Sequence, residues 1–169
     1  MAFKSTSGIV AVSFSVSEPA ADTFAQEEIN LSLDVLNSEI FVVLGIDLDP
    51  TAPSNVAATN TQTQMSLTST TQTAVQLISN TNCLAEERLN IRQDAGGAVG
   101  PVLYRASNGS TPIANIDYIG IIATDNFFVQ IKGSNNLVAQ TGTGRVWGYR
   151  ARADASTYAA LVQSEVLSA

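Results

Sequence analysis

Apolar and polar side chains alternate with a period of two along much of this chain, which is the pattern of half-buried β-strands. In residues 10–16, four apolar side chains alternate with alanine and serine, and in residues 29–35 four more alternate with Asn, Ser and Asp. Residues 40–48 begin with five consecutive apolar side chains, which predicts a strand covered on both faces. We expect Asn37-Ser38 to form the turn into this run and Pro50 to end it.

The rest of the chain predicts more short strands, separated by Gly, Asn and Pro turns. The expected strands span residues 61–71, 73–79, 84–93, 102–105, 113–124, 127–132, 137–140 and 145–152. Turns are expected at Gly96-Gly97, at Asn108-Gly109 and at the glycines of residues 141–144. After Asp154, a candidate N-cap, apolar side chains recur at helical spacing and predict one short C-terminal helix.

Roughly eight to ten strands with almost no helix predict an all-β fold, an antiparallel β-sandwich of jelly-roll type with about eight strands. Parallel α/β folds need helical crossovers, and the pattern offers none. A chain of 169 residues is long enough for one core and too short for two ordinary domains. We expect an N-terminal arm (1–7), a jelly-roll domain (8–152) and a C-terminal tail or short helix (153–169), with both ends reaching neighbouring subunits.

Composition narrows the class of function. Residues 50–85 contain no charged side chain, and 21 of these 36 residues are Ser, Thr, Asn or Gln. A surface made of neutral hydrogen-bonding groups is better suited to an assembled shell than to a freely diffusing enzyme. The formal charge of −7 disfavours direct binding to nucleic acid, except at local contacts. All of this excess lies in residues 1–85, which could face the arginines of another copy or form an ordinary solvated acidic surface.

Several kinds of chemistry are excluded by the residues present. The chain has no histidine, which removes Ser-His-Asp and Cys-His catalysis and every zinc site that needs imidazole. The single cysteine, Cys83, cannot form an internal disulfide, and the neighbouring Glu86 and Glu87 disfavour its thiolate. Paired carboxylates are the one catalytic route left, and acids are common on any surface of this charge. We therefore predict that the chain is not an enzyme and has no cofactor.

Two clusters are candidates for binding. Asp47 and Asp49 lie on one face of an expected strand end, where they could supply oxygens to calcium or simply be solvated. The second cluster, in residues 145–152, holds the only tryptophan and three of the eight basic residues. Alternation places Trp147, Tyr149 and Ala151 on one face and Arg150 and Arg152 on the other. The interface or ligand candidates are Arg145, Trp147, Tyr149, Arg150 and Arg152, and the plainer interpretation is buried aromatics beside solvated arginines.

The first 16 residues lack the continuous apolar run of a signal peptide, and no stretch is long enough to span a membrane. With eight strand-like runs in about 150 residues and a short tail, the layout resembles the small single jelly-roll coat proteins of viruses. The resemblance implies a capsid subunit of a virus or phage particle, made in the host cytoplasm. Its partners would be copies of itself in a symmetric assembly, together with other virion proteins.

Two other functions fit the same pattern. A carbohydrate-binding β-sandwich would use Trp147, Tyr149, Tyr104 or Tyr118 as stacking platforms for sugar rings. A subunit of an extracellular pilus-like fibre would be completed by a strand donated from its neighbour, and it would require export.

Overall fold

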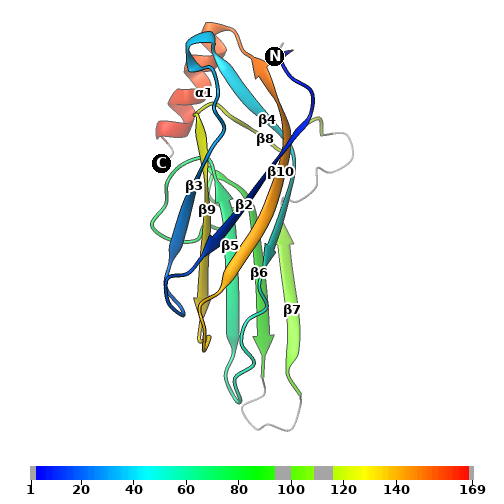
Figure 1. Ribbon diagram of the computed structural model, residues 1–169, viewed down its shortest axis with the longest axis vertical. Helices are drawn as coiled ribbons and strands as arrows, with labels where there is room; N and C mark the ends of the chain where they lie inside the picture. The colour runs from blue at the N-terminus through cyan, green and yellow to red at the C-terminus, as the bar shows by residue number, and fades with distance from the viewer. Residues whose placement is uncertain (1–2, 94–99, 109–115, 168–169) are drawn as a thin grey trace.

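The computed structural model describes residues 3–93, 100–108 and 116–167 (Figure 1). Within these ranges it contains ten strands, one 3-10 helix and one α-helix. The strands are β1 (Lys4–Ser5), β2 (Val10–Ser17), β3 (Ala25–Asn30), β4 (Glu39–Pro50), β5 (Thr61–Thr68), β6 (Cys83–Arg92), β7 (Val102–Asn108), β8 (Gly120–Ile122), β9 (Asn126–Ser134) and β10 (Thr141–Arg152). The helices are η1 (Val35–Asn37) and α1 (Ala155–Leu167).

The strands form two five-stranded antiparallel sheets that face each other. Sheet A has the order β2, β10, β4, β8, and β1 continues the β2 edge by pairing with the end of β10. Sheet B has the order β3, β9, β5, β6, β7. On one side, sheet A ends with the three residues of β8, which pair only with Phe41–Val43 of β4. Sheet B continues past this side with β6 and β7.

The pairing of the strands defines the topology. Without β1 and β7, eight strands remain, and they pair first with last: β2 with β10, β3 with β9, β4 with β8, and β5 with β6. This nested pairing is that of one long hairpin rolled into two sheets, which is the jelly roll. The predicted antiparallel sandwich of jelly-roll type is therefore confirmed.

The main core lies between the sheets, where the alternating strands place their apolar side chains. Phe14 of β2 meets Phe127 of β9 edge to face, with ring centroids 5.7 Å apart and an interplanar angle of 76°. Met65 and Leu67 of β5 are fully buried against them. The period-two pattern correctly predicted which face of these strands is buried.

A second apolar cluster explains why β4 begins with an unbroken apolar run. Phe41 and Val43 face the main core, whereas Ile40 and Val42 belong to a separate cluster on the other side of sheet A. Helix α1 covers this side with Tyr158, Leu161 and Val162. Strand β4 is thus buried on both faces, as its composition predicted.

Polar contacts fasten helix α1 at both ends. Its N-cap is Asp154, as predicted, because the carboxylate accepts a hydrogen bond from the Thr157 amide at 2.8 Å. Near the other end, the buried carboxylate of Glu165 accepts hydrogen bonds from the amides of Ala123 (3.0 Å) and Thr124 (3.2 Å). Burial raises the pKa of Glu165, and these hydrogen bonds oppose the shift.

Three segments differ from the expected secondary structure. Residues 141–144 are not a turn but the first part of β10, and residues 31–34 and 137–140 are loops rather than strand. In β10, the inner positions 142 and 144 are glycines because the side chains of Met65 and Phe14 occupy the space that a Cβ would need. The loop before β10 is held by Glu18, whose buried carboxylate accepts from the amides of Gly133 and Gln140.

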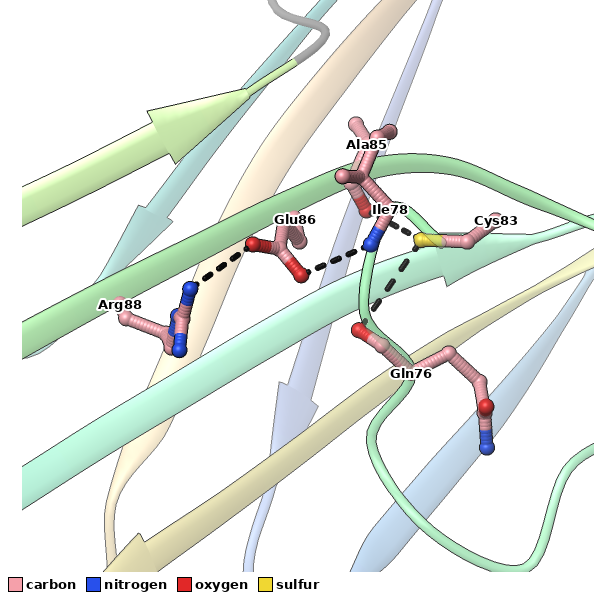
Figure 2. A network of polar contacts seen from close by, with 6 residues as sticks. All are labelled: Gln76, Ile78, Cys83, Ala85, Glu86 and Arg88. Carbon is pink, nitrogen blue, oxygen red and sulfur yellow. Dashed lines mark hydrogen bonds and ion pairs between the residues drawn. The ribbon is translucent and has the colours of Figure 1, made fainter. Parts of the chain in front are cut away.

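The expected strand at residues 73–79 is also wrong, because its backbone amides bind side chains instead of a neighbouring strand. The amide of Gln76 donates to Ser66 Oγ at 3.0 Å, and that of Ile78 donates to Glu86 Oε2 at 2.9 Å (Figure 2). This loop lies over the outer face of sheet B. Leu77 in this loop is 44% exposed.

The uncharged tract, residues 50–85, contributes less to the protein surface than its composition predicted. Its buried polar members are Thr61, Thr63, Ser66, Thr68, Ser69, Thr70 and Asn82. Ser66, Thr68, Thr70 and Asn82 belong to one network, in which the fully buried Gln130 accepts from Ser66 at 2.8 Å and donates to Thr68 at 2.7 Å. Thr61 and Thr63 donate instead to Ser54 and Gln140. Neutral polar groups suit this position because each can be satisfied within the network, whereas a charge would remain costly.

The expected turns at Gly96-Gly97 and Asn108-Gly109 lie wholly or partly outside the described residues, and so does the first part of the strand expected at 113–124. In the single chain, both expected arms lie on their own sheet A. Lys4 and Ser5 pair with Arg152 and Ala151 of β10, and residues 155–167 form the docked helix.

Candidate functional site

The outer face of sheet A brings together several of the residues singled out in the sequence. The register of β10 places Arg145 between Ser13 of β2 and Asp47 of β4, and Thr143 opposite Asp49. An open hollow of about 550 Å³ lies over this face. Its lining residues are Ser13, Phe14, Asp47, Asp49, Thr143, Gly144, Arg145 and Trp147.

Within this hollow, Arg145 is held by its neighbours. Its Nε donates to Ser13 Oγ at 3.1 Å, and its guanidinium carbon lies 5.9 Å from the centroid of the Trp147 ring. A cation at this distance over an indole is attracted to the ring face. That face of Trp147 is therefore occupied by a side chain of the same strand, which leaves less of the ring for stacking on a sugar.

The remaining candidates of β10 lie apart from this hollow. Tyr149 packs at the margin of the cluster beneath helix α1, together with Tyr118. The guanidinium of Arg150 donates to the carbonyl of Leu31 at 2.8 Å, and Arg152 is exposed at the end of the strand. The alternation was predicted correctly, but the structure separates the five candidates into four environments.

Asp47 and Asp49 lie on the same face of β4, and both are exposed. Among the described residues, no group of three or more Asp, Glu, Cys or His side chains is placed to hold a metal ion. Calcium needs six or more oxygen ligands, so two solvated carboxylates make a poor calcium site.

A different surface, not singled out from the sequence, is the free edge of sheet B. Among the described residues, strand β7 pairs with β6 on one side only, and three consecutive large side chains on it are exposed: Val102 (57%), Leu103 (59%) and Tyr104 (56%). We call these three residues, together with Arg105, the β7 edge. Leu103 and Arg105 are on the inner face of the sheet, opposite Ile91 and Leu89 of β6. They are uncovered because sheet A does not extend this far.

An ion pair fixes the β7 edge to the interior. Arg105 Nε lies 2.5 Å from Glu87 Oε1, and the Glu87 side chain is only 2% exposed while that of Arg105 is 57% exposed. Burial raises the pKa of Glu87, Arg105 opposes the rise, and Asp47 and Asp49 add to it. The pKa of Arg105 is raised in turn by its hydrogen bond to Glu87 and by the nearby acids.

The opposite edge of sheet B has a contrasting surface. Strand β3 carries two consecutive exposed glutamates, Glu27 and Glu28. Charged residues on an edge strand discourage pairing with another chain, and the apolar triplet of β7 has the reverse effect. The only sequence signal for the β7 edge is a short apolar run after Pro101, which does not reveal whether a strand is central or at an edge.

The single cysteine is structural. Cys83 is buried at the start of β6, and its Sγ donates to the carbonyls of Ala85 (3.3 Å) and Gln76 (3.9 Å), as Figure 2 shows. Burial, with a contribution from the charge of Glu86, raises the pKa of this thiol to about 11. The thiol therefore stays protonated at neutral pH and is a poor nucleophile.

No known protein family matches the chain, and no curated protein matches it. Among solved structures, it is similar to a chain of Cocksfoot mottle virus (11% identity, TM-score 0.39), which covers 95% of this chain and 100% of that one. It is also similar to Desmodium yellow mottle tymovirus (14% identity, TM-score 0.29, covering 88% and 91%). A third similar structure is VP1 of Trichodysplasia spinulosa-associated polyomavirus in complex with 3'-sialyllactose (8% identity, TM-score 0.37, covering 88% and 95%).

These three similar structures are viral, which is the class that the strand layout resembled. All three TM-scores lie below 0.5. In the described part of the chain, no helix is both long enough and apolar enough to cross a membrane.

Proposed function

We propose that this chain is a structural coat subunit that self-assembles into a virus or phage particle. The observation that carries the proposal is the β7 edge, where three consecutive large apolar side chains are more than half exposed on a strand that pairs with β6 on one side and with no other described strand. An exposed apolar edge strand is an aggregation hazard in a protein that stays monomeric, and it is expected where another chain covers it.

The rest of the molecule supports a subunit built for contact. The jelly roll is common in viral capsid subunits, although lectins and cupins share it. Large apolar side chains are also exposed at Leu36 of η1 (97%), at Leu137 (72%) and at Ile9 (70%). In an assembly, neighbouring subunits would bury such scattered apolar side chains. The role is structural, and the assembly would be the virion.

The carbohydrate-binding alternative has weaker support. Its four aromatic candidates do not form one platform, because Arg145 lies over Trp147, and Tyr149 and Tyr118 pack against the cluster beneath helix α1. Only Tyr104 is more than half exposed, and it belongs to the β7 edge. The pilus-like alternative requires a sandwich that lacks a strand, whereas all four nested pairs of this jelly roll are formed within one chain.

Negative-stain electron microscopy of the purified chain tests the proposal. A coat subunit should form closed particles, or rings of subunits of one size, over a range of salt concentrations. The control is the same preparation at a concentration low enough to dissociate the assembly. A field of single small molecules at high concentration, across this range of salt, would remove the proposal.

A further inference from the structure

We propose that strand β7 pairs antiparallel with strand β7 of a second copy, about a two-fold axis at Leu103. The inference rests on the proposed function and names one contact of the assembly. Paired in this way, the two copies of sheet B would form one continuous sheet across the interface.

The chemistry of the edge selects the partner. Val102 and Tyr104 project from the outer face of sheet B and Leu103 from the inner face, so the partner strand must bring apolar side chains on both faces. Strand β3, the other edge of the sheet, would instead bring Glu27 and Glu28. Strand β7 of a second copy brings the matching triplet, because a two-fold contact pairs a surface with itself.

Charge and side-chain pairing select the register. An axis at Arg105 would set two arginines directly opposite each other, which is unfavourable. An axis at Leu103 instead pairs Val102 with the other copy's Tyr104, an aromatic and β-branched pair of a favourable kind. On the inner face, Ile91 and Leu103 of each copy would form a continuous apolar row, since these two residues are already paired within one subunit.

The size of the contact indicates its strength. The three side chains expose on the order of 100 Å² each, so pairing them would bury roughly 600 Å² over both copies. A stable isolated dimer usually needs more than about 1,200 Å². The β7 pair is therefore a weak contact by itself, which becomes effective when other contacts of a shell hold the same subunits in place.

Cross-linking through introduced cysteines tests the register. Leu103→Cys and Ala106→Cys are prepared separately in the full chain, with Cys83 left in its buried site, and treated with a short bismaleimide linker. At the proposed axis the two thiols introduced by Leu103→Cys are adjacent, whereas those introduced by Ala106→Cys lie about 20 Å apart along the strands. We expect at least tenfold more cross-linked dimer for Leu103→Cys than for Ala106→Cys. Equal yields, a higher yield for Ala106→Cys, or no dimer from either would overturn the proposal.

A second variant separates this inference from the function on which it rests. Leu103→Lys places a charge on the axis, at a position that is already 59% exposed, so the fold should be retained by circular dichroism. We expect the concentration needed for assembly to rise at least tenfold. If this variant assembles as readily as the wild type, the β7 pair is wrong and the coat function stands. If the wild type never assembles, the coat function fails, and the ratio of cross-linked dimers still decides the β7 pair.

Discussion

The glycines on the inner face of β10 allow a sharp test of how closely this strand packs against its neighbours. A Cβ added at Gly148 would meet the backbone carbonyl of Val42 closer than real Cβ atoms approach any atom, and Cε1 of Phe41 at 2.5 Å. Carbon atoms in contact normally lie about 3.5–4.0 Å apart. Phe41 is only 1% exposed, and the carbonyl belongs to a paired strand, so neither can move away freely.

A matched control exists six residues earlier on the same face. A Cβ at Gly142 would meet Met65 Sδ at 2.6 Å and Ile131 Cδ1 at 3.3 Å, and these are the ends of side chains. A methionine thioether can adjust by rotating its three side-chain bonds. Neither glycine has its φ in the left-handed region, so the comparison isolates the available space.

We predict that Gly148→Ala lowers the free energy of unfolding by about 2 kcal/mol, and Gly142→Ala by less than about 1 kcal/mol. Overpacking a core costs about 1–3 kcal/mol, and alanine recovers about 0.4–1 kcal/mol by restricting the unfolded chain. Urea unfolding below the assembly concentration, followed by the fluorescence of Trp147 and by circular dichroism, measures both values. If Gly148→Ala unfolds within about 0.5 kcal/mol of the wild type, or if Gly142→Ala is the more damaging change, the packing of β10 against β4 is wrong.

Three further predictions follow from buried polar groups. Gln130→Leu should lower the free energy of unfolding by about 2–4 kcal/mol, because it removes the hydrogen bonds that Gln130 makes with Ser66, Thr68 and Gln26. A urea midpoint equal to that of the wild type would contradict the network. The Cys83 thiol, with its pKa of about 11, should not react with a thiol reagent at pH 8 in the folded chain and should react fully in urea. Rapid reaction without urea would show that the thiol is accessible in the folded chain. Because the pKa of Glu165 is raised above its ordinary 4.5, this group stabilises the fold most below that pH and loses its contribution as pH rises through the folded pKa. Glutamine does not ionise, so between pH 4.5 and 7 the free energy of unfolding of Glu165→Gln should lack the decrease with rising pH that Glu165 causes in the wild type. Parallel curves of the free energy of unfolding against pH for the two proteins would refute the buried site.

The strands that the sequence predicted best are those with one buried and one open face. In β2, Phe14 and Val16 are buried while Ser13, Ser15 and Ser17 are exposed, because this strand has the core on one side only. The local sequence pattern fails to predict the secondary structure where hydrogen bonds to side chains distant in sequence determine it. Residues 73–79 look like a strand, yet Ser66 and Glu86 satisfy the amides that a neighbouring strand would have used.

The candidate site shows the same division between local and distant information. The outward position of Arg145 and Trp147 follows from alternation alone. The β7 edge could not be predicted in this way, because the exposure of Leu103 depends on where sheet A ends, and that is set by the three-residue strand β8. The sequence predicts a turn at glycines 142 and 144 because glycine usually marks one, whereas the positions of Met65 and Phe14 explain why glycine stands there in a strand.

Sedimentation velocity over a wide range of protein concentration tests the central claim most directly. A coat subunit should convert cooperatively, above a threshold concentration, from a small species to one large species of defined size, with little between them. A single monomeric boundary that persists to the highest soluble concentration would contradict the account.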